Sequence, residues 1–269
     1  MDEPHLRALR CPECGKKFQP YSSLTQGEDM KDGQIICERG HSWSVKDGIP
    51  TLVYPRPSKE DAKWIQEYDK MAESYDELVK QYNDWLGIDM MKERERFSVF
   101  IPIEGPCKIL DVSIGTAANF VALGNKFKHQ MGRFNLHGMD LSKEMLNVAK
   151  KKTDSLGLHV SLTHGSVFNI PYQSNFFDIV LHSGGINTFS DIHGALSEML
   201  RVVRSHGVVL VIDEGLSPKK RGSEEGKEII KTNSLFASRP PLQFIPEQAR
   251  NVEISYIMND TFYQMVFTK

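Results

Sequence analysis

The fold of this chain is decided by the stretch Ile109-Leu110-Asp111-Val112-Ser113-Ile114-Gly115-Thr116-Ala117. Its first residues predict a buried strand that ends at Asp111, and the small residues Ser113, Gly115 and Ala117 permit a tight turn. A helix that begins near Thr116 would point its unpaired N–H groups at whatever lies in the turn. The stretch therefore predicts a nucleotide-cofactor site, and the simpler alternative is a strand-to-helix turn without a ligand.

A second acidic residue supports a ligand site. Asp140 closes the apolar run from Phe134 to Met139, and a carboxylate at that strand tip can accept hydrogen bonds from both ribose hydroxyls. The pattern S-x-G-x-A is not the G-x-G-x-x-G of pyrophosphate binders, and the interval from Gly115 to Asp140 exceeds the ~20 residues usual there. A nucleoside ligand without a pyrophosphate is favoured.

These segments resemble the class I S-adenosylmethionine-dependent methyltransferases, whose glycine loop is typically L-D-V-G-C-G-T-G. Gly165–Tyr172 is similar to the family's G-D-A-x-x-L-P-F, Phe176–Leu181 to its fourth strand, and Ala195–Val202 to A-L-x-E-x-x-R-V; the likeness spans roughly residues 64 to 215. Ser113, Ala117 and Ser166 depart from the family pattern. The resemblance implies S-adenosylmethionine as cofactor, with contacts from Tyr75, Asp111, Ser113, Gly115, Thr116, Ala117, Asp140, Leu141, Ser166, Val167 and His182.

Hydrophobic patterning predicts the same fold class without the family. Residues 208–212 are apolar without alternation, as in a strand buried on both faces, and residues 192–203 carry one apolar helical face. Strands and helices thus alternate from residue 108 to 213, while residues 252–257 and 262–267 flank a turn-prone tetrad. We expect an α/β, Rossmann-like, seven-stranded and mostly parallel sheet that closes with an antiparallel hairpin.

The N-terminal residues carry a different pattern. Cys11, Cys14, Cys37 and His41 have the spacing C-x2-C-x22-C-x3-H, a closed tetrahedral donor set for a structural zinc ion. Separate thiols are the alternative, and Cys107 is expected to be a lone buried thiol. We expect a zinc-ribbon domain over residues 1–56 and a methyltransferase domain over residues 57–269.

The ribbon also bears on the substrate. Cys37–Val53 resembles the zinc ribbon of the large-subunit ribosomal RNA guanine-N1 methyltransferases, where the module contributes to RNA binding. Residues 1–54, however, hold seven Lys or Arg against eight Asp or Glu, a balance of 7 − 8 = −1, whereas RNA docking requires a positive excess. We therefore predict methyl transfer to a small-molecule acceptor, with an rRNA methyltransferase and a non-catalytic cofactor-binding partner protein as alternatives.

Residues near the expected transfer point are candidates for catalysis. His182 follows the fourth strand and is the candidate general base, although a histidine bonded to the backbone or cofactor is the commoner case. Met71–Asp76 resembles the ubiquinone and menaquinone biosynthesis methyltransferases (methyltransferase type 11), which implies that Tyr68 and Tyr75 cover the cofactor. Ordinary core tyrosines are the alternative. Asn187 and Asp213 are further candidates at this sheet edge.

Bulk properties set mild limits. A net charge of −2 over 269 residues gives no excess that would attract polyanions. The longest aliphatic run, residues 208–212, is far shorter than the ~20 residues that cross a bilayer. With four cysteines in a chain of this size and no recognisable signal peptide, we expect a cytoplasmic protein without disulfides.

Overall fold

The computed structural model describes residues 1–20, 29–102 and 104–269, and in them one mixed sheet organises the chain. Its strands are β1 (Gly33–Ile36), β2 (Ser42–Lys46), β3 (Ile49–Leu52), β4 (Cys107–Val112), β5 (Phe134–Asp140), β6 (Val160–Gly165), β7 (Phe177–Ser183), β8 (Val203–Glu214), β9 (Arg250–Ile257) and β10 (Phe262–Thr268). The α-helices are α1 (Glu3–Ala8), α2 (Lys59–Met71), α3 (Tyr75–Leu86), α4 (Met90–Glu95), α5 (Ala118–Phe127), α6 (Lys143–Ser155), α7 (Ile192–Val202), α8 (Pro218–Arg221) and α9 (Glu224–Thr232).

The sheet has the strand order β1-β2-β3-β6-β5-β4-β7-β8-β10-β9. Strands β6, β5, β4, β7 and β8 are parallel, and β10 is antiparallel to both β8 and β9. The predicted parallel centre and closing hairpin are thus confirmed, but the prediction of seven strands was wrong, because the described residues form ten. The three additional strands come from the N-terminal segment.

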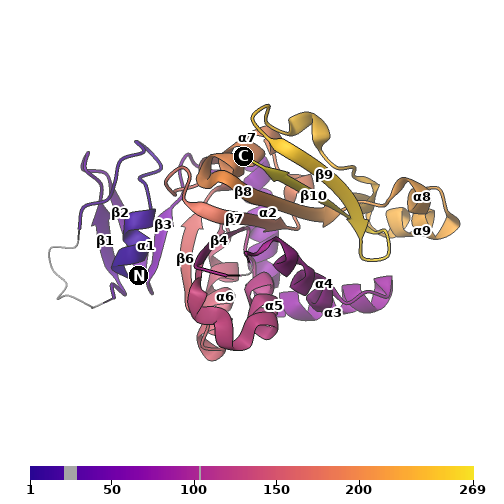
Figure 1. The fold of residues 1–269 in the computed structure, drawn as a ribbon, viewed down its shortest axis with the longest axis horizontal. Helices are drawn as coiled ribbons and strands as arrows, with labels where there is room; N and C mark the ends of the chain where they lie inside the picture. The colour runs from indigo at the N-terminus through magenta and orange to yellow at the C-terminus, as the bar shows by residue number, and fades with distance from the viewer. Residues whose placement is uncertain (21–28, 103) are drawn as a thin grey trace.

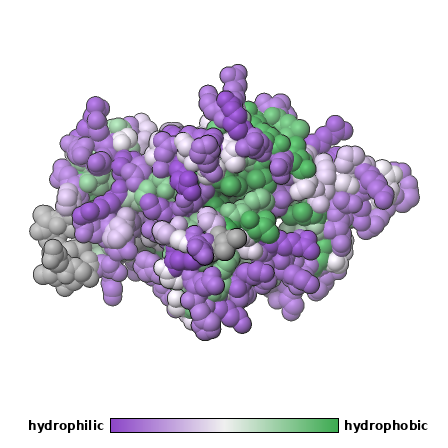
Figure 2. Space-filling view, viewed as in Figure 1, coloured by the Kyte–Doolittle hydropathy of each residue, from purple (hydrophilic) through white to green (hydrophobic). Residues whose placement is uncertain are grey.

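The N-terminal strands extend the main sheet because β3 has two neighbours. It pairs antiparallel with β2 and parallel with β6, where Thr51 lies opposite His164 and Leu52 opposite Gly165. Figure 1 shows these strands at one end of the molecule and helices α8 and α9 at the other. In Figure 2 the N-terminal strands are mostly hydrophilic at the surface, and apolar residues gather around β8 and β10. The predicted boundary between residues 56 and 57 stays a prediction.

Alternating side chains of the parallel strands form two apolar layers, one on each sheet face. Leu110 and Val112 of β4 pack with α7, whereas Ile109 packs with α5 and α6. The layer of Leu110 also contains the buried N-terminal residues, among them Leu9 and Cys37. Buried apolar area stabilises a fold by about 25 cal/mol per Å², so the N-terminal segment and the sheet stabilise each other through one continuous core.

The segment that follows residue 57 is helical and amphipathic. Ser58 caps α2, since its Oγ accepts the Asp61 N–H at 3.1 Å. The apolar and aromatic side chains between Trp64 and Tyr82 are divided between α2, the 3-10 turn η1 (Ala72–Ser74) and α3. These elements lie over the carboxyl ends of the parallel strands, where they close the pocket described next.

Candidate functional site

A pocket opens at the carboxyl ends of the parallel strands, the edge at which ligands bind in open α/β sheets. Its floor is the loop after β4, and its walls come from the ends of β5, β6 and β7 and from helices α2 and α3. Of the residues predicted to contact a cofactor, seven line it: Tyr75, Ser113, Gly115, Thr116, Asp140, Leu141 and Val167. Asp111, Ala117, Ser166 and His182 do not.

The loop after β4 requires a left-handed backbone at three positions. The φ angles of Ser113, Gly115 and Ala117 are +59°, +54° and +65°. A residue with a Cβ is disfavoured in this region by roughly 1–2 kcal/mol. The positions where this chain departs from the family's glycines are therefore those at which glycine relieves strain. Ala117 is the N-cap of α5, and it offers no side-chain acceptor to the helix.

Asp140 is fixed at the end of β5 by backbone donors. Its Oδ2 accepts the Gly115 N–H at 2.8 Å and its Oδ1 accepts the Ser142 N–H at 2.9 Å. Burial raises the pKa of Asp140, and these N–H donors oppose that increase. Each carboxylate oxygen can accept a second hydrogen bond, so Asp140 can hold the loop and still accept bonds from a diol in the pocket.

Asp111 lies beneath the loop and does not reach the pocket. Its carboxylate accepts two bonds from Asn119 Nδ2, at 3.3 and 3.1 Å, and Asn119 Oδ1 accepts from Arg94 Nε at 3.1 Å. Burial raises the pKa of Asp111 to about 7, although Asn119 and Arg94 both act to lower it. Asn119 and Arg94 line the pocket, so Asp111 helps to position these two pocket side chains by hydrogen bonds.

Helix α3 covers the glycine-rich loop. Thr116 Oγ1 donates to Asp76 Oδ1 at 2.7 Å, and Asp76 also pairs with Lys152 of α6. Tyr68 and Tyr75 both line the pocket, with ring centroids 6.2 Å apart. Burial raises the pKa of both phenols, to about 12 for Tyr75. Both therefore stay neutral, and the predicted covering residues are at the pocket.

His182 lies within β7 and its side chain is buried away from the pocket. Its Nδ1 donates to the Val112 carbonyl at 3.0 Å, and its ring packs against Phe189 at a centroid distance of 5.1 Å. Burial lowers the pKa of His182, with Asp213 and Val112 acting in the opposite direction. The neutral imidazole supports the loop after β7, which matches the alternative of a backbone-bonded histidine.

Asn187 and Asp213 are joined to each other. Asp213 Oδ2 accepts the Asn187 N–H at 2.8 Å, and Asn187 Oδ1 accepts the Tyr263 hydroxyl at 2.9 Å. Next to them, burial and the proximity of Asp213 raise the pKa of Glu214 well above its usual value. These bonds tie the loop after β7 to β8 and β10.

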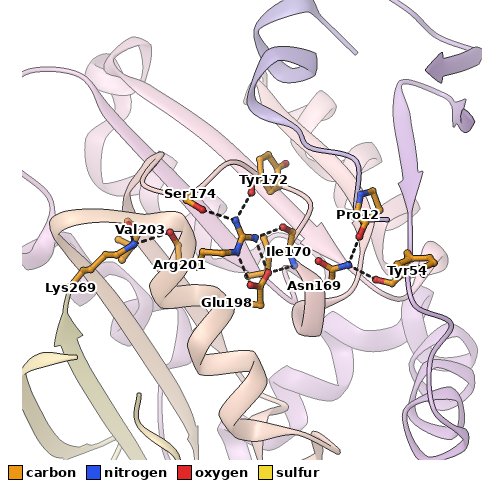
Figure 3. Close-up of polar contacts among 10 residues, drawn as sticks. All are labelled: Pro12, Tyr54, Asn169, Ile170, Tyr172, Ser174, Glu198, Arg201, Val203 and Lys269. Atoms are coloured by element: carbon orange, nitrogen blue, oxygen red, sulfur yellow. Dashed lines mark hydrogen bonds and ion pairs between the residues drawn. The ribbon is translucent and has the colours of Figure 1, made fainter. Parts of the chain in front are cut away.

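The segment that contains Ser166 is held from two sides (Figure 3). Asn169 Nδ2 donates to the carbonyls of Pro12 and Tyr54 at 2.8 and 2.9 Å. From α7, Arg201 donates to the carbonyls of Ile170 and Tyr172 at 2.6 and 2.8 Å. Ser166 Oγ accepts the Phe168 N–H at 3.3 Å, so it caps the turn. Val167 and Phe168 thereby form one wall of the pocket.

The N-terminal segment brings its four predicted ligands together. The donor atoms of Cys11, Cys14, Cys37 and His41 lie within 4.8 Å of one another. Zn–S bonds of about 2.3 Å in a tetrahedron place two sulfurs about 3.8 Å apart, and the Cys14 and Cys37 sulfurs are 3.7 Å apart. His41 Nδ1 is 3.4 Å from the Cys11 sulfur, and its Nε2 is 3.5 Å from a Glu13 carboxylate oxygen. The arrangement fits a tetrahedral metal ion with an outer carboxylate.

Several pocket residues were not predicted from the sequence. They are Asp61, Trp64, Arg94, Phe168 and Phe189. The helical spacing of Asp61, Trp64 and Tyr68 places them on one helix face and was a usable signal. Arg94 reaches the site only through tertiary packing of α4 on α5, which no local pattern indicates.

Comparisons with known proteins agree with this geometry. The family model of a methyltransferase domain matches residues 110–211. The chain is 28% identical over 165 residues to a demethylmenaquinone methyltransferase of Bacillus pumilus, covering 59% of this chain and 65% of that protein. It is 30% identical over 162 residues to the Bacteroides fragilis protein of the same name, covering 60% and 63%. The match thus spans slightly less than two thirds of these relatives.

Solved structures give the fold. A putative S-adenosylmethionine-dependent methyltransferase from Methanococcus maripaludis superposes with a TM-score of 0.57 at 21% identity, over 81% of this chain and 97% of that one. Phosphoethanolamine N-methyltransferase 2 of Haemonchus contortus, in complex with S-adenosylmethionine, gives 0.51 at 16% identity, over 64% and 51%. The chain has the Rossmann-like fold of these methyltransferases.

Proposed function

We propose that this chain transfers a methyl group from S-adenosylmethionine to a small-molecule acceptor. The observation that carries the proposal is the pocket formed by the left-handed loop at Ser113, Gly115 and Ala117 together with Asp140. The methyltransferase match over residues 110–211 includes both parts. The sulfonium supplies an activated methyl group, so the protein's contribution is mainly to position the two reactants.

The chain's residues have separate roles in this proposal. Asp140 accepts hydrogen bonds from the ribose hydroxyls, and the N–H groups of the loop and of α5 face the rest of the cofactor. Val167 and Phe168 provide an apolar wall for the adenine. Tyr68 and Tyr75 exclude water from above. The buried His182 bonds to Val112 at the end of β4 and packs against Phe189 in the loop after β7, and Asp111 supports the pocket through Asn119.

We also propose that Cys11, Cys14, Cys37 and His41 bind a structural zinc ion, in support of which their donor atoms have the spacing of a tetrahedral site. Among the described residues no helix is long and apolar enough to cross a membrane. All four cysteines are free thiols, which suits a reducing compartment such as the cytoplasm, the location that we propose.

An RNA substrate is less well supported than a small molecule. The charge balance of −1 over residues 1–54 offers no excess of cations for phosphate contacts. The N-terminal segment also packs against the sheet, since β3 pairs with β6 and Asn169 donates to two carbonyls of the N-terminal segment. The curated relatives are named for demethylmenaquinone, which is not a nucleic acid.

The Asp140→Ala variant tests the proposal. Loss of a charge-assisted hydrogen-bond pair is expected to weaken S-adenosylmethionine binding by about 1.5–3 kcal/mol, measured by calorimetry. Asp84→Ala, which removes an exposed carboxylate of α3, is the matched control. Unchanged affinity in Asp140→Ala contradicts the assignment. Binding without formation of S-adenosylhomocysteine over a broad acceptor panel would favour a non-catalytic partner protein.

A further inference from the structure

One carboxylate in the pocket is not used by the proposed cofactor contacts. Asp61 lies in the first turn of α2, is 8% exposed and lines the pocket. Its Oδ2 accepts the hydroxyls of Ser58 and Ser190, at 2.5 and 2.8 Å. The bond from Ser58 belongs to the helix cap, whereas the bond from Ser190 joins α2 to the loop after β7.

The second oxygen of Asp61 has no such partner. Oδ1 accepts no hydrogen bond from the described residues, and it is not among their fully buried side-chain atoms that lack a partner. Among the same residues no Lys, Arg or His forms an ion pair with Asp61. A buried carboxylate is unfavourable unless a cation or enough donors compensate it. In the described residues, the side-chain hydrogen bonds to this carboxylate come from two neutral hydroxyls on one oxygen, and a bound cation would supply the opposite charge.

Aromatic side chains line the same pocket. Trp64 and Tyr68 follow Asp61 at helical spacing, so all three share one face of α2. Phe189 precedes Ser190, which bonds to Asp61, and the Phe189 ring lies 5.7 Å from that of Phe168. Trp64, Tyr68, Phe168 and Phe189 all line the pocket. Aromatic faces attract cations, and together with a carboxylate they select quaternary or protonated amines over neutral groups.

We propose that Asp61, Trp64, Tyr68 and Phe189 form a cation-binding subsite that recognises an ammonium group on the methyl acceptor. The inference rests on the proposed function and specifies the acceptor class. The subsite only binds: no bond forms or breaks there, and the atom that receives the methyl group is a different one. A small acceptor with a cationic head group would give Asp61 an ion-pair partner, which a neutral acceptor cannot supply.

Two probes of equal shape test the subsite: choline and 3,3-dimethyl-1-butanol, its uncharged carbon isostere. Dissociation constants are measured by NMR titration of protein saturated with S-adenosylhomocysteine. We expect choline to bind about tenfold more tightly than the isostere, and Asp61→Asn to bring the two within about twofold. Trp64→Leu should reduce the preference as well. Glu60→Gln, which removes an exposed negative charge one residue away, should leave it unchanged.

Two outcomes overturn the proposal. Equal affinity of wild-type protein for the two probes would show that the subsite does not select charge. Weaker S-adenosylmethionine binding in Asp61→Asn, without any preference for choline in the wild type, would assign Asp61 to the cofactor's own cationic groups. Failure of the proposed function is distinguishable, because it appears as absent S-adenosylmethionine binding in the wild-type protein.

Discussion

At the scale of single residues, hydrogen bonds from Arg94 to Asn119 and from Asn119 to Asp111 connect the pocket lining to a buried carboxylate. Asp111 is completely buried, and its carboxylate accepts hydrogen bonds from the amide of Asn119 and not from a guanidinium. A carboxylate in this position is held at the cost of desolvation, and the raised pKa reflects that cost. Its protonation state in the folded protein therefore changes near neutral pH.

This titration predicts a pH dependence of stability. The pKa of Asp111 rises from 3.8 to about 7 on folding, so the folded state binds the proton more tightly than the unfolded state. The resulting stabilisation is fully present below about pH 4 and is lost as the pH rises through 7. Asp111→Asn should remove this contribution. Urea unfolding at pH 5, 6 and 7 is expected to show wild-type stability falling relative to the variant by up to about 1.4 kcal/mol per pH unit.

The difference between the two proteins isolates Asp111 from the other groups that titrate in this range. Asp154→Asn neutralises an exposed carboxylate of α6. Its free energy of unfolding should differ from that of the wild type by the same amount at all three pH values. If the free energy of unfolding of Asp111→Asn changes with pH as that of the wild type does, the Asp111 carboxylate does not take up a proton on folding.

Single residues also show how far sequence reasoning reaches into the site. Asp140 and Gly115 could be placed because strand tips and tight turns have local patterns. His182 was expected in a loop as a candidate base, yet it lies in β7 and bonds to Val112, a contact between neighbouring strands. Arg94 could not be placed, because only the packing of α4 on α5 brings it to the pocket, whereas Asp61 shares a helix face with Trp64 and Tyr68 and could have been grouped with them.

At the scale of elements, the turn from Gly165 to Tyr172 connects the two parts of the chain. Asn169 binds the carbonyl of Pro12, which lies between the proposed metal ligands Cys11 and Cys14, and the carbonyl of Tyr54 after β3. Glu198 accepts the Ile170 N–H at 2.8 Å from the opposite side. Val167 and Phe168, in the same turn, line the pocket. The position of the N-terminal segment is thereby coupled to the pocket wall.

The coupling predicts a local effect of Asn169→Ala. Loss of two hydrogen bonds should cost about 1–2 kcal/mol of docking free energy, so the backbone amides of Cys11–Gly15 should exchange faster with solvent. Hydrogen exchange followed by mass spectrometry measures this change. Asn147→Ala, on the exposed side of α6, is the control and should leave the exchange unchanged. Identical exchange in Asn169→Ala and wild type would contradict the coupling.

At the scale of the whole molecule, the parallel centre followed from sequence because buried strands and amphipathic helices leave strong periodic patterns. The extension of the sheet by the N-terminal strands could not be predicted from the sequence. Ile49–Leu52 was taken as part of a separate ribbon, since nothing in four residues indicates a partner more than 100 positions away, yet it pairs with β6. The N-terminal core then merges with the core of the sheet, so the two predicted parts share one apolar layer.

This shared layer shapes the expected result of metal removal. We expect one zinc ion per chain by elemental analysis, and none in Cys14→Ser. Because a metal site supplies folding free energy to a small segment, β1 and β2 should lose amide protection in that variant. The central strands β4, β5 and β7 should keep theirs, since their partners lie within the sheet. Cys107→Ala removes a buried thiol of β4 outside the cluster and should retain the zinc.

Metal-free wild-type protein with freely titratable thiols, or full zinc content in Cys14→Ser, would contradict the assignment. Loss of protection throughout the sheet would instead show that the N-terminal segment and the sheet unfold as one cooperative unit.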